Sequence, residues 1–232
     1  MEFQILVADS SHYSYAEVIC DTIAEAAKAR GTGIAKREPS YVTGKMEEGK
    51  AIIALQDGNF AGFCYIETWE HGKYAANSGL IVSPNYRKHG LAKKIKAKAF
   101  ELSRKKFPDA KLFGITTSLP VMKINSELGY KPVTFSELTE DEEFWAGCQS
   151  CPNFDVLTRN QRKLCLCTGM LYDPAKEKKE TEKKPKIEEE SLNLRWQQYK
   201  AHLRKRNNNP LLQKIKERIF GKAVKVLAWT KS

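Results

Sequence analysis

Long hydrophobic runs are absent from this sequence. No stretch of its 232 residues approaches the roughly 20 apolar residues of a membrane-spanning helix. The first residues, MEFQILVADS, lack the basic flank and long apolar segment of a secretory signal peptide. The six cysteines are too few, in a chain of this length, to indicate a disulfide-stabilised scaffold. We therefore expect a cytoplasmic protein, in which 41% hydrophobic residues are enough to build a core.

Most of the chain carries almost no excess of positive charge. The formal net charge is +11, but residues 192–232 hold 11 Lys and Arg against one acidic residue. Residues 176–190 hold six charges of each sign and a single apolar residue, so we expect a solvated linker there. Residues 1–175 are left with 22 basic and 21 acidic residues. The basicity therefore predicts a partner for the tail and says little about the substrate of the body.

The first 140 residues alternate between strand-like and helix-like segments. The sequence QDGN at 56–59 is a hairpin turn signal, and strand, helix and strand follow one another behind it. We predict an α/β (α+β) fold, with a mixed central sheet flanked by helices, for residues 1–140. Expected strands lie at 3–8, 51–55, 60–68, 111–117 and 131–135, with another ending at 84; expected helices lie at 15–29, 90–106 and shortly before 128.

The stretch SPNYRKHGLAKK, residues 83–94, connects a buried strand to a helix. The first turn of a helix leaves backbone N–H groups without partners, and these groups, with the helix dipole, can bind an anion. Gly90 lets a ligand approach the backbone closely, while Arg87, Lys88 and His89 add positive charge. The spacing fits a pyrophosphate. An ordinary strand-to-helix turn with basic surface residues is the alternative.

The segment VSPNYRKHGLAKKI resembles the acyl-CoA-binding motif of the Gcn5-related N-acetyltransferases (GNAT), with Ala92 as its last small residue. SELGYKPV resembles the final helix end and strand of that fold, so the likeness covers roughly residues 1–138. The resemblance implies acetyl-CoA as cosubstrate, with its pyrophosphate on the backbone amides from Arg87 through Leu91 to Ala92. It also implies that the pantetheine arm hydrogen-bonds along Leu80, Ile81 and Val82, where this strand diverges from its neighbour.

Residues 33–66 and 114–133 resemble, more narrowly, the acetyltransferase domain of N-acetylglutamate synthases. This likeness implies an acyltransferase of the arginine-biosynthesis type, which transfers acetyl (or succinyl) to the amine of a small acidic amino acid such as glutamate. Arg37 matches a basic residue that holds the substrate carboxylate, and a guanidinium can bind a carboxylate through two hydrogen bonds. Thr117 is a further candidate for substrate binding. Ser118 departs from the pattern, because such synthases tend to have a basic residue there.

Acetyl transfer needs a base for the amine, a donor for the developing oxyanion and a proton for the leaving thiolate. A backbone N–H of the diverging strand can serve the oxyanion. Glu67 is the candidate base, because alternation along CYIETW places it beside the divergence. Glu70, or Asn77 or Ser78 through a water, are competitors. Many relatives place a tyrosine where this chain has Asn125, so we expect Asn125 to contact coenzyme A or substrate, and water or another group to protonate the thiolate.

Residues 141–175 contain four cysteines in two close pairs, and we predict a separate Cys-rich extension there. The spacing C-x2-C, thirteen residues, C-x-C fits a tetrahedral zinc site, with reduced buried thiols or a redox pair as alternatives. The candidate ligands are Cys148, Cys151, Cys165 and Cys167. Two other cysteines and two aromatic residues have the pattern of core residues: Cys20, Cys64, Tyr130 and Phe135.

The tail, residues 191–232, has the pattern of two basic amphipathic helices. Its first apolar stripe is Leu192, Trp196, Tyr199 and Leu203, and a second helix opens at Pro210. These stripes predict packing on the body or on another protomer, or docking on an anionic membrane surface or an acidic protein. The sequence does not favour nucleic acid as a partner, because no recognised binding motif accompanies the charge.

Two other functions fit the same sequence. The chain could acetylate a polyamine or a protein lysine, which would require acidic residues near the acceptor. It could also be a non-catalytic, zinc-stapled module that binds acyl-CoA.

Overall fold

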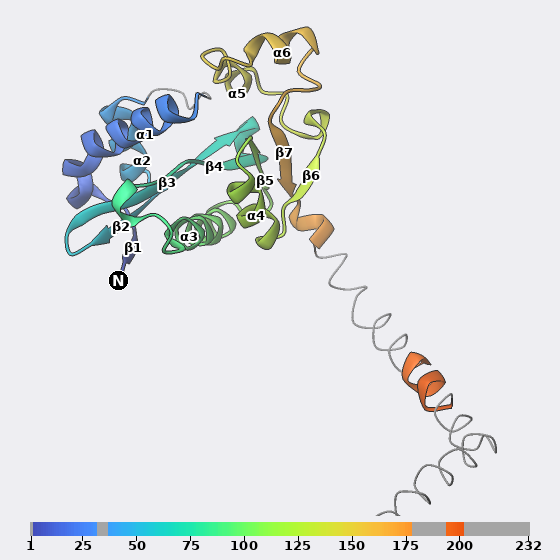
Figure 1. Ribbon diagram of the computed structural model, residues 1–232. Helices are drawn as coiled ribbons and strands as arrows, with labels where there is room; N and C mark the ends of the chain where they lie inside the picture. The colour runs from blue at the N-terminus through green and yellow to red at the C-terminus, as the bar shows by residue number, and fades with distance from the viewer. Residues whose placement is uncertain (1, 32–36, 178–193, 202–232) are drawn as a thin grey trace, which may run out of the picture. The chain divides into compact units, whose positions relative to one another are not determined.

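In a computed structural model of the protein, residues 2–31, 37–177 and 194–201 are described. The chain divides into two compact units, residues 1–175 and 176–232, and each is described by itself. The first unit is built on a seven-stranded sheet in the order β1-β2-β3-β4-β5-β7-β6 (Figure 1). Its strands are β1 (Gln4–Val7), β2 (Ala51–Gln56), β3 (Asn59–Trp69), β4 (Tyr74–Val82), β5 (Lys111–Thr116), β6 (Lys131–Val133) and β7 (Thr168–Tyr172).

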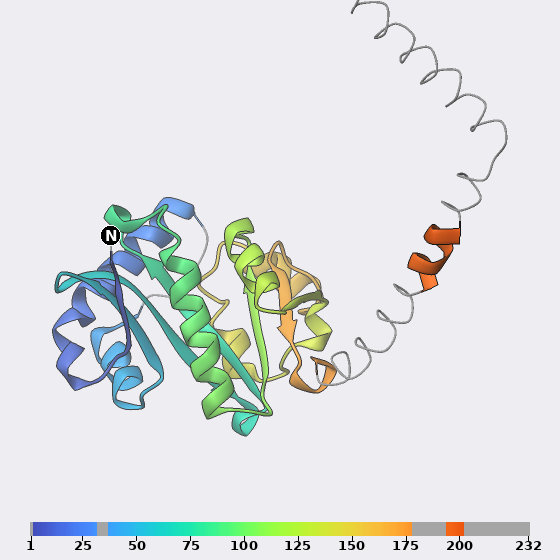
Figure 2. The same ribbon diagram turned by 90° about the horizontal axis from the view of Figure 1, so that it is seen from below.

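Helices cover both faces of this sheet, which confirms the predicted mixed α/β architecture. The helices are α1 (Ala16–Arg30), α2 (Pro39–Glu47), α3 (Leu91–Lys106), α4 (Leu119–Glu127), α5 (Glu142–Ala146) and α6 (Phe154–Arg159). In Figure 1, α1 and α2 lie with α5 and α6 above the sheet, while α3 and α4 lie below it. Figure 2, viewed from below, shows the green helix α3 running across that lower face.

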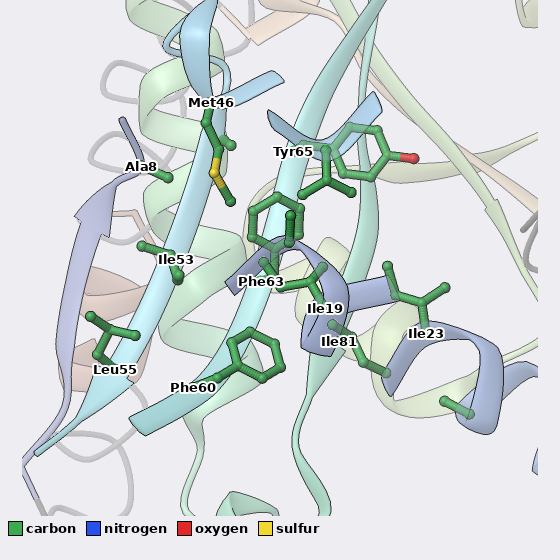
Figure 3. Packing of buried hydrophobic residues seen from close by; sticks show 14 residues of the cluster. Ala8, Ile19, Ile23, Met46, Ile53, Leu55, Phe60, Phe63, Tyr65 and Ile81 are labelled. Atoms are coloured by element: carbon green, nitrogen blue, oxygen red, sulfur yellow. The ribbon is translucent and has the colours of Figure 1, made fainter. Parts of the chain in front are cut away.

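Apolar packing holds the helices against the sheet. On one face, Ile19 and Ile23 of α1 and Met46 of α2 pack on inward-facing side chains of β2 and β3 such as Ile53 and Phe63 (Figure 3). On the other face, Leu91, Ile95 and Ala99 of α3, spaced four residues apart, pack on the opposite side of the same strands. Full burial of each larger side chain stabilises the fold by roughly 1.5–3 kcal/mol.

The hairpin predicted at QDGN is confirmed. Gln56 pairs with Asn59 across the turn from β2 to β3. Asp57 and Gly58 have φ values of 50° and 77°, the left-handed conformations that a tight two-residue hairpin requires.

The centre of the sheet is open between β4 and β5. These parallel strands pair only through Tyr74, Ala75 and Ala76 of β4, so the rest of β4 runs away from β5. A bulge lies just beyond, because Phe63 of β3 faces Ile81 whereas Tyr65 faces Ser78. Gly79 occupies this bulge with φ +62°, and a Cβ atom there would lie 2.3 Å from the Tyr65 ring. The bulge therefore needs glycine, and it leaves room for the Tyr65 ring beside the opening.

Residues 141–175 supply part of the sheet, so the separate Cys-rich extension is not confirmed. β7 lies between β5 and β6 and pairs antiparallel with both. Trp145 of α5 and Leu157 of α6 are buried in a cluster with Phe113 of β5. The segment thus covers the β5–β7 half of the sheet, opposite α4.

Of the second unit, residues 176–177 and a helix over residues 194–201 are described. Leu194, Trp196 and Tyr199 are half exposed or more, and the Trp196 and Tyr199 rings stack at 5.8 Å. Leu192, Leu203, the helix expected from Pro210 and most of the expected linker lie outside the described residues. Within the described ranges, no helix is long and apolar enough to cross a membrane.

Candidate active site

A cavity of about 610 Å³ lies at the opening between β4 and β5. Residues 76–80 of β4 and 114–116 of β5 line it along the two diverging strands. The start of α2 and the segment of α5 and α6 form its walls on one face of the sheet, and Lys96 and Asn125 line it from the helices of the other face. The cavity is therefore lined by groups from both faces of the sheet.

On the face of α2, four side chains form a connected network. The Arg37 Nε donates a hydrogen bond to the Tyr65 hydroxyl at 2.7 Å. The Arg37 guanidinium also lies 5.3 Å from the centre of the Tyr41 ring. The Tyr41 hydroxyl in turn donates to Oε1 of Glu67. The cavity thus holds the Arg37 guanidinium and the Glu67 carboxylate on the same side of the sheet.

The electrostatics of this network keep Arg37 charged. Burial opposes the charge of the guanidinium, but the neighbouring Tyr65, Glu67 and Tyr41 outweigh it, and the pKa of Arg37 is raised. Burial, followed by the hydrogen bond to Glu67, raises the pKa of Tyr41. Burial also raises the pKa of Tyr65. Both phenols therefore stay protonated at neutral pH.

The opposite face brings a different set of groups to the cavity. Asn125 of α4 is 2% exposed, and its Nδ2 donates to the Met170 sulfur at 3.7 Å. Its Oδ1 has no hydrogen-bond partner among the residues that the structure describes. Lys96 of α3 is 3% exposed, and burial lowers its pKa to about 8. The sequence interpretation included Asn125 and missed Lys96. The signal was the helical period, because Lys96 falls on one face of α3 with the buried Ala99 and Ser103.

The residues predicted to bind phosphate lie at the start of α3. Gly90 is the N-cap with φ +72°, and no atom lies within 4 Å of the place where its Cβ would be. Lys88 also has a positive φ of 69°. The Arg87 Nε donates to the Val82 carbonyl at 3.2 Å, which fixes the loop to the end of β4. The approach to the backbone N–H groups of the first helical turn is therefore open, as an anion site needs.

Some predicted residues lie away from the cavity. Thr117 is exposed, and its neighbour Thr116 lines the cavity instead. Leu80 borders the cavity, whereas Ile81, Val82 and Leu91 are buried in the core. Lys88, His89 and Ala92 surround the start of α3 and are absent from the cavity lining.

Glu70, a competing candidate for the base, has a structural role. Its Oε1 accepts hydrogen bonds from the Thr139 hydroxyl at 2.6 Å and the Glu140 N–H at 3.2 Å. Asn77 and Ser78, the candidates that would hold a water, do line the cavity. The core predictions for Cys64, Tyr130 and Phe135 are confirmed, and Cys20 packs half-buried against the α1 cluster.

The four clustered cysteines also border the cavity, and all are free thiols. Burial, and then the neighbouring thiols, raise the pKa of Cys148 to about 11 and of Cys167 to about 12. Their chemistry suits zinc, but among the described residues no group of three or more His, Cys, Asp or Glu is arranged to hold a metal ion. The zinc interpretation is not confirmed. Cys148, Cys165 and Cys167 pack, partly buried, against the cluster that contains Trp145 and Leu157.

Replacing Gly90 with valine is expected to weaken coenzyme A binding. A residue with a Cβ at this φ costs roughly 1–2 kcal/mol of strain, and the valine methyl groups would obstruct the backbone N–H groups. Calorimetry with coenzyme A measures the affinity. Gly58→Val is the matched control, because Gly58 also has a positive φ and open space but lies in the β2–β3 turn. Unchanged affinity in a folded Gly90→Val protein would contradict this placement.

Comparison with known proteins agrees with the fold. Residues 20–119 match the acetyltransferase (GNAT) family. No curated protein sequence matches the chain significantly. Among solved structures, the chain is similar to N-acetylglutamate synthase from Neisseria gonorrhoeae, complexed with coenzyme A and N-acetyl-glutamate. The TM-score is 0.53 and the sequence identity is 17%. The match covers 75% of this chain and 35% of that one. The alignment thus spans about a third of the Neisseria protein.

Two shorter proteins match over nearly their whole length. Rv2747 from Mycobacterium tuberculosis, in complex with CoA and NLQ, has a TM-score of 0.52 at 14% identity, over 73% of this chain and 98% of that one. The protein yncA from Salmonella typhimurium, with its cofactor acetyl-CoA, has a TM-score of 0.52 at 12% identity, over 75% and 95% of the two chains. At these identities the likeness shows a shared fold.

Proposed function

We propose that this chain transfers an acetyl (or succinyl) group from coenzyme A to the amine of a small acidic amino acid such as glutamate. This is a reaction of the arginine-biosynthesis type. The proposal starts from the match of residues 20–119 to the GNAT acetyltransferase family. The observation that carries the proposal is that Arg37 and Glu67 line one cavity and are each held by a tyrosine. Arg37 donates a hydrogen bond to Tyr65, and Tyr41 donates one to Glu67. An amino acid presents both an ammonium and a carboxylate, so its recognition needs a fixed charge of each sign.

The coenzyme part of the proposal rests on two features of the fold. The start of α3 offers an open, positively charged anion site beside Gly90. Among the described residues, β4 has no strand partner beyond Ala76 on the side of β5, so this edge can pair with the amides of a pantetheine arm. Structures of the same fold that hold coenzyme A or acetyl-CoA support this assignment.

In the proposed reaction, Arg37 holds a carboxylate of the acceptor and so sets the position of its amine. Glu67, oriented by the Tyr41 hydroxyl, takes a proton from the acceptor ammonium, and the neutral amine that results attacks the thioester carbonyl. A backbone N–H at the free edge of β4 stabilises the oxyanion that develops. The tetrahedral intermediate then collapses, the C–S bond breaks, and the amide product and the coenzyme A thiolate are formed.

A thiol-release assay with acetyl-CoA and succinyl-CoA, against a panel of amino acids, tests this proposal. We expect the highest kcat/KM for an acidic amino acid, with lower values for its amide and for basic amino acids. Mass spectrometry should find the N-acylated product. No acidic amino acid accepting either acyl group, while another amine does, would refute the acceptor assignment and leave the reaction class intact.

A cationic acceptor, a polyamine or a protein lysine, is the second candidate. Three carboxylates, Glu38, Glu67 and Glu143, line the cavity, and they would attract an additional positive charge. The same assay with spermidine and a lysine peptide separates the two candidates. Arg37 favours the acidic acceptor, because its guanidinium lies in the same cavity and would repel a polycation.

For the tail we propose docking on an anionic surface, such as a membrane or an acidic protein. In the described helix, the Lys200 ammonium lies 5.3 Å from the centre of the exposed Trp196 ring, so apolar and basic groups share one surface. We expect the full chain to sediment with anionic liposomes, and to do so less as salt rises, because exposed charges are screened within about 8 Å at physiological ionic strength. Absent or salt-insensitive binding would exclude the membrane.

A further inference from the structure

Lys96 is a buried amine that the reaction described so far does not use. It lies in the middle of α3 and borders the cavity, yet only 3% of its surface is exposed. Its ammonium lies 5.4 Å from the centre of the Tyr130 ring. Among the described residues, none forms a hydrogen bond or an ion pair with it. A buried lysine without a carboxylate partner is costly, so its presence at a cavity wall calls for a ligand or a reaction.

The groups around Lys96 are polar and uncharged. Cys64 of β3 is the ionisable group that acts on its charge, and burial raises the pKa of that thiol to about 11, so it stays neutral. Asn125 of α4 and Tyr130, just before β6, border the same region, and Asn77 reaches it from β4. Within the part of the chain that the structure describes, three buried polar atoms have no hydrogen-bond partner: Asn125 Oδ1, Asn77 Oδ1 and the Tyr130 hydroxyl. Unpaired polar atoms around an unpaired ammonium indicate a place where a polar group of a ligand belongs.

From its position, Lys96 would lie closer to the sulfur of a bound thioester than to its carbonyl group. The phosphate site is the first turn of the same helix, so coenzyme A would enter the opening from the face of α3 and α4. Arg37 and Glu67, which would hold the acceptor, approach the cavity from the opposite face. A thioester that crosses the opening therefore has its sulfur on the side of Lys96 and its carbonyl towards Glu67.

We propose that the Lys96 ammonium is the acid that protonates the leaving coenzyme A thiolate, a role that rests on the acyl-transfer reaction proposed above and on no particular acceptor. As the tetrahedral intermediate collapses, the C–S bond electrons move to sulfur, and a proton passes from Nζ of Lys96 to that sulfur. Lys96 becomes a neutral amine, and solvent reprotonates it once the coenzyme leaves. The acceptor ammonium loses two protons, one to Glu67 before the attack and one to solvent from the tetrahedral intermediate. Glu67 then releases its proton to solvent, so charge and atoms balance.

The acidity of Lys96 suits this step. Burial lowers its pKa to about 8, close to the pKa of about 8.5 of a free thiol, so the transfer is nearly balanced in energy. Lys96 can donate only while it is an ammonium. Its contribution is therefore present below pH 8 and is lost as the pH rises through about 8. An asparagine at position 125 cannot supply this proton, whereas Lys96 borders the same cavity.

Three variants separate a catalytic role from a structural one. Lys96→Met removes the acidic group and keeps a side chain of similar volume. Lys96→Arg keeps the positive charge, but a guanidinium holds its proton too tightly to donate it. Lys105→Met is the control, because Lys105 is an exposed lysine of the same helix. We expect kcat in Lys96→Met and Lys96→Arg to fall by roughly 10²-fold, and the alkaline decline of kcat near pH 8 to disappear. The Tm of Lys96→Met should be unchanged or higher, because a buried charge is removed. Lys105→Met should behave as wild type.

The titration of bound coenzyme A gives a readout that needs no acceptor. The ultraviolet absorbance of the thiolate should report a lower pKa for the thiol bound to the wild type than to Lys96→Met, by on the order of one unit, because an adjacent ammonium stabilises the thiolate. Equal thiol pKa values in the two proteins would overturn the proposal, whatever the acceptor proves to be. A loss in Lys96→Met with succinyl-CoA alone, and not with acetyl-CoA, would also overturn it and assign Lys96 to the acyl carboxylate.

Discussion

Replacing Glu67 with glutamine is expected to lower kcat by about 10²- to 10³-fold, the usual contribution of a general base. Glutamine keeps the shape and can still accept the hydrogen bond from Tyr41 at its oxygen, so folding and coenzyme affinity should hardly change. The loss should shrink as the pH rises, because more of the acceptor amine is then deprotonated in solution. Steady-state kinetics across a pH series measure both effects.

Glu143→Gln is the matched control for this prediction. Glu143 lines the same cavity from α5, and it has no proposed role in proton transfer. A Glu67→Gln protein with wild-type kcat would show that the base is elsewhere, and a water held by Asn77 or Ser78 would then be the next group to test.

Replacing Arg37 with alanine is expected to raise the apparent KM for the amino acid by about 10- to 100-fold, which corresponds to the loss of ~1.5–3 kcal/mol from a charged hydrogen-bond partner. The affinity for coenzyme A should be nearly unchanged, because Arg37 lies on the opposite face from α3. Lysine at this position should restore only part of the affinity, since an ammonium cannot bind a carboxylate through two fixed N–H groups. Steady-state kinetics and coenzyme calorimetry on the same preparation separate the two effects.

Arg159→Ala serves as the control, because Arg159 is an exposed arginine of α6 that pairs with Asp155. Equal damage by Arg37→Ala to the amino acid and coenzyme constants would point instead to a defect in folding, since Arg37 also anchors the Tyr65 hydroxyl.

The sequence was sufficient for the part of the sheet whose pattern is local. The hairpin at Asp57 and Gly58 and the apolar stripe of α3 are signals carried by neighbouring residues, and both are confirmed. α2 was missed because, within a mostly polar segment, it buries only Val42 and Met46. Its start did carry a signal in Pro39, since proline favours the first turn of a helix.

The last strand was missed for a different reason. β7 is buried on both faces between β5 and β6, so it shows no alternation, and it directly follows a cysteine pair that suggested a separate module. Its position in the sheet depends on contacts with residues some sixty positions earlier in the chain, such as Leu112 paired with Tyr172. No local pattern contains that information.

The sequence named some of the residues that line the cavity and missed others. Arg37, Glu67 and Asn125 do meet at one cavity, but the walls formed by α5 and α6 and the lysine from the middle of α3 depend on tertiary packing. Lys96 is one of several lysines in a basic helix. The helical period places it on the same face as Ala99 and Ser103, and its 3% exposure separates it from Lys94 and Lys98.

A crystal structure with coenzyme A and N-acetylglutamate tests the central claim most directly, because the account assigns a place to each part of the two ligands. We predict the pyrophosphate on the first turn of α3 beside Gly90, the pantetheine along the free edge of β4, and the sulfur in the opening next to Lys96. The carboxylate of the product should contact Arg37. Coenzyme A bound away from the β4–β5 opening, or a product carboxylate held by other groups, would contradict the account.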